Sequence, residues 1–388
     1  MFNVKEHLRA LVESHAPSGH EGPAREIVRE AWSGLVDSME EDKLGSLIGI
    51  KRATERTSPL DLGPSPRRIM LAAHMDEIGM MVGGIQDGFI YVHRISGVDN
   101  RVMLSQPVMV HGRETLPGVV AAKPPHLLTA DARRKYPAFK ELIIDVGLPP
   151  ARVAELVRVG DLITLDVPMI DLQGKRVAAK AMDDRACVAA VTVCLHELQS
   201  MRHKWDVYAA STVQEETGLY GATTAAYHIK PDVAIALDVT FAEQPGVEAD
   251  TASEMNGGPV IGIGPNFHPR LYEKLRGVAR HYEIKVQDDA TPGASGTDAW
   301  AIQVALSGIP TALLSIPIRN MHSPVETLDL RDIERTGRLL AHFIASLDAD
   351  FLTAIAWDAP KEDTAKDNGG SEDADVHDDD SDDDENDD

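Results

Sequence analysis

The chain has 388 residues, of which 43% are hydrophobic and 5% aromatic, and its formal net charge is −24. This length is enough for one large or two moderate domains with a full hydrophobic core. No apolar run reaches the roughly 20 residues of a membrane helix, and an acidic body would be repelled by phosphates. We therefore expect neither a membrane protein nor a partner of nucleic acids.

Two further features of the sequence predict a cytoplasmic protein. The first residues, MFNVKEHLRALVESHAP, lack the basic segment and apolar segment of a secretory signal. The two cysteines, Cys187 and Cys194, lie seven residues apart in an expected helix, roughly 10 Å apart along its axis, which is too far for a disulfide. A reducing compartment agrees with both observations.

The C-terminal residues 361–388 carry much of the charge. They contain 15 acidic residues against two lysines, a net charge of −13, which leaves −11 for the first 360 residues. This segment has almost no apolar side chains to bury, so we expect a disordered acidic tail over 359–388. A solubilising role is the simpler interpretation, and cation binding or regulation is the alternative.

The N-terminal part has the pattern of an α/β fold. Apolar residues at helical spacing predict helices over 4–16 and 23–36, the second with proline near its start. Two apolar segments, 44–52 and 67–76, then predict a hairpin-like pair of strands around a polar, proline-rich loop.

From about residue 78 to 172 the sequence changes to short alternating strands with Gly, Asn and Pro turns, interrupted by one helix over 150–160. This pattern is typical of a small β-barrel or sandwich. The α/β pattern then resumes, with helices expected over 184–203, 269–283 and 329–349 and strands over 205–213, 232–239, 284–288 and 311–316. We therefore predict a discontinuous α/β domain (1–77 plus 173–358) with a β-rich domain (78–172) inserted into it.

Histidines and carboxylates follow the ends of the expected α/β strands. They are His74, Asp76, Glu215, Glu216, Asp238 and His322, with Asp183 and Asp184 before the helix over 184–203. Functional groups collect at the carboxyl ends of strands in α/β sheets, so these side chains can meet in space. Taken singly, Asp-Asp before a helix is an N-cap and His-x-Asp a hydrogen-bonded histidine. Together they suit zinc, cobalt or manganese in a hydrolytic site, and five ligands are enough for two ions that share a carboxylate.

Six motifs resemble those of one family in order and approximate spacing. They are AAHMDEIGMMV, AKAMDDRACVA, VQEETGLYGA, ALDVT, SGTDAWAI and IPIRNMHSPVE. The sequence is similar over roughly residues 4–350 to the M42 family of metallo-aminopeptidases, which includes the tetrahedral TET enzymes and the glutamyl aminopeptidases. The resemblance implies an α/β/α sandwich of the dinuclear-metal exopeptidase type with an inserted PDZ-like β-barrel used for dimerisation.

The resemblance also implies the ligands of two divalent ions in each subunit, with zinc or cobalt expected first and manganese as a further candidate. Asp183 would bridge the two ions. His74 and Asp238 would complete the shell of one ion, and Glu216 and His322 that of the other.

Other roles follow from the same resemblance. Asp76 would orient the ring of His74, and Glu215 would act as general base toward a metal-activated water. Asp184 would not be a ligand, and the bond that joins Asp183 to it would be cis, as in related exopeptidases. For Arg185 we expect a structural role.

The implied function is a metal-dependent aminopeptidase that removes N-terminal residues from peptides with a free N-terminus. The implied assembly is a homo-dodecamer built from dimers, in which the polar stretch TADARRKY (129–136) is a candidate loop toward a partner subunit's site. The family pattern is not complete. Asn320 and the segment 241–246 depart from it, which leaves the preferred N-terminal residue open. Thr297 and Asp298 either line the substrate pocket or cap a loop.

Two alternatives stay open. One is an endoglucanase-type glycoside hydrolase, whose two carboxylates must face each other about 5–9 Å apart across a sugar. Glu215 and Glu216, as neighbours on an expected extended segment, would point to opposite sides, and aromatic residues for sugar stacking are scarce. The other alternative is an inactive self-compartmentalised scaffold, which a missing ligand would indicate, and none is missing.

Overall fold

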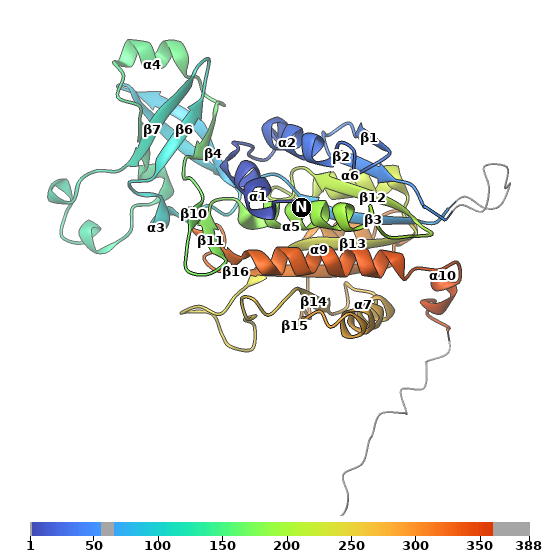
Figure 1. The fold of residues 1–388 in the computed structure, drawn as a ribbon. Coiled ribbons are helices and arrows are strands. Elements are labelled where there is room, and N and C mark those ends of the chain that lie inside the picture. The colour runs from blue at the N-terminus through green and yellow to red at the C-terminus, as the bar shows by residue number, and fades with distance from the viewer. Residues whose placement is uncertain (1, 56–65, 360–388) are drawn as a thin grey trace, which may run out of the picture.

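The computed structural model describes residues 2–55 and 66–359. An eight-stranded sheet forms the centre of its larger part (Figure 1). In spatial order the strands are β1 (Ser38–Glu41), β2 (Leu47–Lys51), β12 (Asp206–Thr212), β3 (Arg68–His74), β13 (Val233–Phe241), β16 (Thr311–Ile318), β14 (Val260–Ile263) and β15 (Gln287–Ala290). The central strands β12, β3, β13 and β16 run parallel. They are apolar almost throughout because both faces of the sheet are covered.

Helices cover the two faces unequally. Five helices pack on one face: α1 (Val4–Glu13), α2 (Gly22–Trp32), α5 (Met182–Glu197), α7 (Pro269–His281) and α9 (Leu330–Ala345). The opposite face carries α6 (Tyr220–Ile229) and α8 (Asp298–Gln303), and the short α10 (Phe351–Ala354) follows α9. Helices α5 and α9 approach closely at Gly337, where a Cβ atom would lie 2.5 Å from Cβ of Val193.

A closed barrel with its own core forms the second part of the molecule, at one end of the sandwich in Figure 1. Its strands, in order around the barrel, are β4 (Gly79–Gln86), β5 (Phe89–Ile95), β8 (Ile143–Asp145), β7 (Thr115–Ala121), β6 (Pro107–His111) and β9 (Leu162–Leu165). Short helices connect them: α3 (Asn100–Met103), α4 (Pro150–Leu156), η1 (Pro125–Leu127), η2 (Ala132–Arg134) and η3 (Phe139–Glu141). The predicted fold class, a sandwich with an inserted barrel, is confirmed.

A separate three-stranded sheet combines two strands that follow the barrel in sequence with a third that precedes α9. It contains β10 (Ile170–Asp171), β11 (Arg176–Ala179) and β17 (Glu326–Asp329). The barrel strands therefore end at Leu165, and β10 pairs outside the barrel. The domain limits given above stay a prediction, and the expected tail, apart from residue 359, lies outside the described residues.

The expected pairing of the two N-terminal strands is wrong. Strands β2 and β3 do not form a hairpin-like pair, because β12 lies between them, antiparallel to β2 and parallel to β3. Helices α6 and α8 and strand β14 were not predicted. Within the described residues, no helix combines the length and apolar character needed to span a membrane.

Candidate metal centre

The predicted ligands meet at the carboxyl edge of the parallel strands. Strand β3 ends at His74, which is aligned with Thr212 at the end of its neighbour β12. The chain continues from β12 into the turn that carries Glu215 and Glu216. Strand β13 carries Asp238 on the other side of β3, as the parallel register requires.

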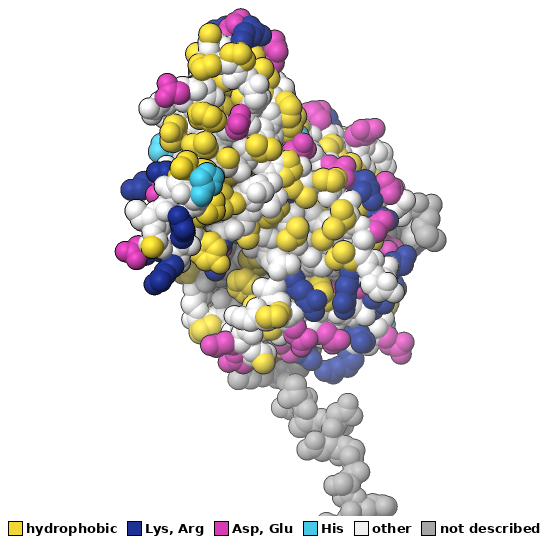
Figure 2. All heavy atoms as spheres, turned by 90° about the vertical axis from the view of Figure 1, so that its left-hand side faces the viewer, with side chains coloured by type: hydrophobic (Ala, Val, Ile, Leu, Met, Phe, Trp, Pro, Cys, Tyr) yellow, Lys and Arg dark blue, Asp and Glu magenta, His cyan; other side chains and the backbone are white. Residues whose placement is uncertain are grey.

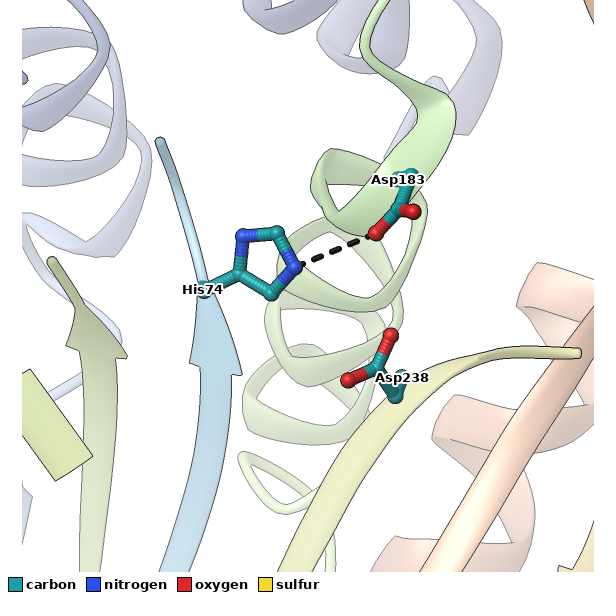
Figure 3. Close-up of side chains that lie close together, drawn as sticks. All are labelled: His74, Asp183 and Asp238. Atoms are coloured by element: carbon teal, nitrogen blue, oxygen red, sulfur yellow. Dashed lines mark hydrogen bonds and ion pairs between the residues drawn. The ribbon is translucent and has the colours of Figure 1, made fainter. Parts of the chain in front are cut away.

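A first group of candidate ligands consists of His74, Asp183 and Asp238, all buried (Figure 3). One coordinating atom of each lies within 4.8 Å of those of the other two. The Nε2 atom of His74 lies 3.1 Å from Oδ1 of Asp183. The Oδ1 atom of Asp238 accepts a hydrogen bond from the backbone N–H of Val239, at 2.8 Å.

A second group consists of Asp183, Glu216 and His322. The Nε2 atom of His322 lies 3.2 Å from Oδ2 of Asp183 and 3.5 Å from Oε1 of Glu216. The two oxygens of Asp183 thus face different groups, Oδ1 toward His74 and Oδ2 toward His322. This is the arrangement expected of a carboxylate that is shared between two cations.

Buried negative charge dominates the electrostatics of the site. Burial, together with the nearby Asp183, raises the pKa of Asp238 well above its usual value. Burial also raises the pKa of Glu215, to about 10, with Asp238 and Asp298 adding to the rise and His74 opposing it. Hydrogen bonds with Asp183 and Glu216 raise the pKa of His322 to about 11. Such a cluster favours bound cations, and its nitrogen and oxygen donors fit zinc, cobalt or manganese.

The carboxylate of Asp76 lies behind His74 and is fully buried. Its Oδ1 atom lies 3.4 Å from Nδ1 of His74, which also lies 3.2 Å from the Asp76 carbonyl oxygen. The same carboxylate accepts hydrogen bonds from the backbone N–H groups of Glu215 (3.1 Å) and Glu216 (3.2 Å) and from Oγ of Ser18 (2.5 Å). Asp76 therefore fixes both a histidine and the loop with the doubled glutamate.

That loop differs from the expected extended segment. Gln214 has a left-handed φ of +55°, and the N–H groups of Gly218 and Leu219 both donate to the carbonyl of Glu215, at 2.9 and 3.0 Å. Glu215 and Glu216 thus lie in a turn, so strand alternation does not separate their side chains. They diverge all the same, because Oε2 of Glu215 lies 3.8 Å from Nε2 of His74 while Glu216 faces His322.

Two buried groups around the centre were not singled out from the sequence. Glu326 accepts a hydrogen bond from the backbone N–H of His322 (2.7 Å) and another from that of Asp183 (3.2 Å). Glu326 is the last residue of the motif IPIRNMHSPVE, and its place in this motif is the feature of the sequence that could have identified it. Glu77 pairs with Lys180 at 2.7 Å and with Arg185 at 3.4 Å.

Asp184 belongs to neither group of candidate ligands. Its bond to Asp183 is cis, as the resemblance implied. Its Oδ2 atom accepts a hydrogen bond from the backbone N–H of His74, at 3.3 Å. Arg185 is buried and donates to four backbone carbonyls, those of Leu11, Ser14, Met75 and Ala16, which ties α1 and the loop after it to the end of β3.

The remaining candidates lie at the start of α8. Asp298 is buried, and its Oδ2 atom accepts a hydrogen bond from Oγ1 of Thr212, at 2.6 Å, at the end of β12. Thr297 shares a hydrogen bond with Ser295, at 2.8 Å. A role of Thr297 and Asp298 in the substrate pocket stays a prediction.

The fold is an α/β/α sandwich with a barrel inserted into the chain, and histidines and carboxylates gather at the ends of its strands. This combination defines the class of the dinuclear-metal exopeptidases. Comparison with known proteins agrees with this class. The chain belongs to the M42 peptidase family, because the family model described as M42 glutamyl aminopeptidase matches residues 62–339.

Individual relatives and structures support the same family. A lysyl aminopeptidase of Pyrococcus furiosus is 36% identical over 347 residues, 88% of this chain and 96% of the relative. The structure of the aminopeptidase APDkam598 from Desulfurococcus kamchatkensis has a TM-score of 0.82 and 36% identity, covering 91% of this chain and 97% of that one. The Pyrococcus horikoshii TET1 peptidase, described as assembling into a tetrahedron or an octahedral shell, has a TM-score of 0.77 and 30% identity, covering 89% and 100%. The chain is therefore a hydrolase of an aminopeptidase family, and the glucanase alternative is disfavoured.

Proposed function

We propose that the chain removes N-terminal residues from peptides at a centre of two divalent metal ions. The observation that carries this proposal is the position of Asp183, with one oxygen 3.1 Å from His74 and the other 3.2 Å from His322. His74, Asp183 and Asp238 would hold one ion. Asp183, Glu216 and His322 would hold the other.

Zinc or cobalt is the proposed metal, with manganese as a further candidate, because the donors are imidazole nitrogens and carboxylate oxygens. Divalent ions at this centre would supply Lewis acidity, which lowers the pKa of water and polarises the scissile carbonyl. The residues of the chain must then position the substrate and move protons.

Glu215 is the proposed general base. It belongs to neither ligand group, yet its Oε2 atom lies 3.8 Å from Nε2 of His74, a residue of the first group. Burial and the neighbouring carboxylates raise its pKa, and the positive charge of bound cations would lower it again toward the pH at which a general base works best. In this proposal Glu215 accepts the proton of the attacking water and delivers it to the leaving amine, while Asp76 holds its backbone in place.

The chemistry of the centre favours a substrate with a free N-terminus. A divalent ion held there would accept the lone pair of the neutral α-amine of a peptide. A capped peptide offers no such donor and would bind more weakly. The side chain preferred at the N-terminus is not assigned, since the relatives include both lysyl and glutamyl aminopeptidases.

We also propose that the barrel mediates dimerisation and that dimers build a homo-dodecamer. The support is twofold. A structure 30% identical to this chain is described as a dodecamer. Figure 2 shows hydrophobic side chains on the exposed surface of the barrel end, and the exposed large hydrophobic residues of its strands are Met81, Phe89, Tyr91 and Val119. A cytoplasmic location is proposed on the two free, buried cysteines.

The test compares two kinds of substrate. The purified full chain is assayed on lysyl, glutamyl and leucyl p-nitroanilides and on carboxymethylcellulose, before and after chelation and after zinc or cobalt is restored. We expect release of nitroaniline that chelation abolishes and metal restores. Cleavage of the cellulose alone would support the glucanase, and no activity on either substrate with both ions bound would support the scaffold. Either result would overturn the proposal.

A further inference from the structure

We propose that Ser96 and Gly97, which follow barrel strand β5, position the second group of candidate ligands and set the affinity of the second ion. Both are then positioning residues supplied by the barrel to a centre otherwise built from the sandwich. The inference rests on the proposed function, because it concerns the ion held by Asp183, Glu216 and His322.

Ser96 binds one of the two carboxylate oxygens of Glu216 and leaves the other facing His322. Its hydroxyl donates a hydrogen bond of 2.7 Å to Oε2 of Glu216, while Oε1 is the oxygen that lies 3.5 Å from Nε2 of His322. The backbone N–H of Glu216 is held in turn by Asp76, at 3.2 Å. With its backbone and one oxygen fixed, Glu216 offers the other oxygen to an ion in a single orientation. Such outer hydrogen bonds tune the affinity of a ligand for its metal.

The backbone of Ser96 is itself unusual. Its φ of +63° lies in the left-handed region that few residues other than glycine adopt. Residues persist in that region when their surroundings fix them, and such residues cluster at functional sites. The hydrogen bond to Glu216 is a contact that depends on this conformation, since the backbone determines where the short side chain of serine points.

Gly97 touches the other ligand of the same group. A Cβ atom at this position would lie 2.4 Å from Nδ1 and 2.8 Å from Cε1 of His322, distances that no side chain tolerates without displacing the ring. The imidazole therefore lies directly against the backbone of Gly97. The loop of His322 is fixed by Glu326, which accepts a hydrogen bond from the backbone N–H of His322 at 2.7 Å.

The first group of ligands is built differently. His74, Asp183 and Asp238 come from β3, the start of α5 and β13, all in the sandwich. A change at Ser96 or Gly97 should therefore lower the affinity for the second ion and leave the affinity for the first ion unchanged. This selectivity distinguishes positioning of the second ion from a general loss of structure.

The inference is tested by titrating the metal-free full chain with Co²⁺. Binding is monitored by calorimetry and by the visible absorption of the bound ion. We expect two ions to bind to the wild type. In Ser96→Ala and Ser96→Gly the first ion should bind as in the wild type and the second about 10–100-fold more weakly. Glycine relieves the left-handed backbone but lacks the hydroxyl, so both variants must weaken the second ion if the hydroxyl is responsible.

Ser105 provides the matched control. It is an exposed serine of the same barrel with a similar left-handed φ of +67°, and Ser105→Ala and Ser105→Gly should bind both ions as the wild type does. Gly97→Ala, with its fold checked by circular dichroism, should bind the second ion more weakly. If this variant does not fold, the Ser96 variants alone decide the test. Wild-type affinity for both ions in either Ser96 variant would overturn the inference, whereas failure of the wild type to bind two ions would overturn the proposed function instead.

Discussion

The substitution Asp76→Asn tests most severely whether hydrogen bonds around the candidate ligands hold them in place. The Asp76 carboxylate contacts His74 through Oδ1 and accepts hydrogen bonds from the backbones of Glu215 and Glu216 and from Ser18. Asparagine keeps one oxygen and replaces the other by an NH₂ group. Because both oxygens accept N–H donors, the NH₂ group must face at least one of them, with no hydrogen bond formed.

The magnitude follows from these contacts. A hydrogen bond to a charged group contributes roughly 1.5–3 kcal/mol, and the variant loses one such bond and the charge that strengthens the others. We therefore expect a loss of about 2–4 kcal/mol in the free energy of unfolding. Since Asp76 supports ligands of both groups, both ions should bind about 10–100-fold more weakly.

The measurements are urea unfolding and metal titration of the wild type and the variant. Asp37→Asn is the control, because Asp37 is an exposed carboxylate that also accepts a backbone N–H, that of Arg52 at 2.6 Å. Its metal affinities should equal those of the wild type. An Asp76→Asn variant that binds both ions with wild-type affinity would refute the role assigned to Asp76.

Two further substitutions test stability. Glu77→Gln leaves buried Lys180 and Arg185 without the carboxylate that pairs with them at 2.7 and 3.4 Å, so urea unfolding should show a loss of about 3–5 kcal/mol, and a loss below about 1 kcal/mol would contradict this account. His7 gives a pH dependence: burial, with a smaller contribution from His196, lowers its pKa from 6.5 to about 4. Between these values the unfolded chain binds a proton that the folded chain does not, so stability falls as the pH falls through this window, by about 2 kcal/mol from pH 7.5 to pH 5. His7→Gln, which can still donate to Thr192, should lack this part of the pH dependence, and an unchanged slope would contradict the assignment.

Much of the centre could be predicted from the sequence because its ligands directly follow apolar strands. Such strands are typical of the middle of a parallel sheet, and their carboxyl ends meet at one edge. His74 and Asp238 lie on neighbouring strands for this reason. The order of the strands was harder to predict, since β12 enters between β2 and β3 from about 130 residues further along the chain.

The supporting residues could not be recognised in the same way. Glu326 and Ser96 are of common residue types, and only their contacts with His322, Asp183 and Glu216 single them out. The turn at Glu215 was mispredicted because a left-handed residue at Gln214 gives no clear signal in the sequence. The contact of Ser96 depends on the packing of the barrel against the sandwich, and those of Glu326 on the packing within the sandwich, which local patterns do not encode.

The central claim is that Glu215 moves the proton while other residues hold the ions. The most direct measurement is the aminopeptidase rate of Glu215→Gln together with its metal content, because glutamine keeps the size of the side chain and loses its basicity. Two ions should remain bound, and kcat should fall by a factor on the order of 10²–10⁴, the usual contribution of a general base. A variant that retains both ions and a kcat near that of the wild type would contradict the account.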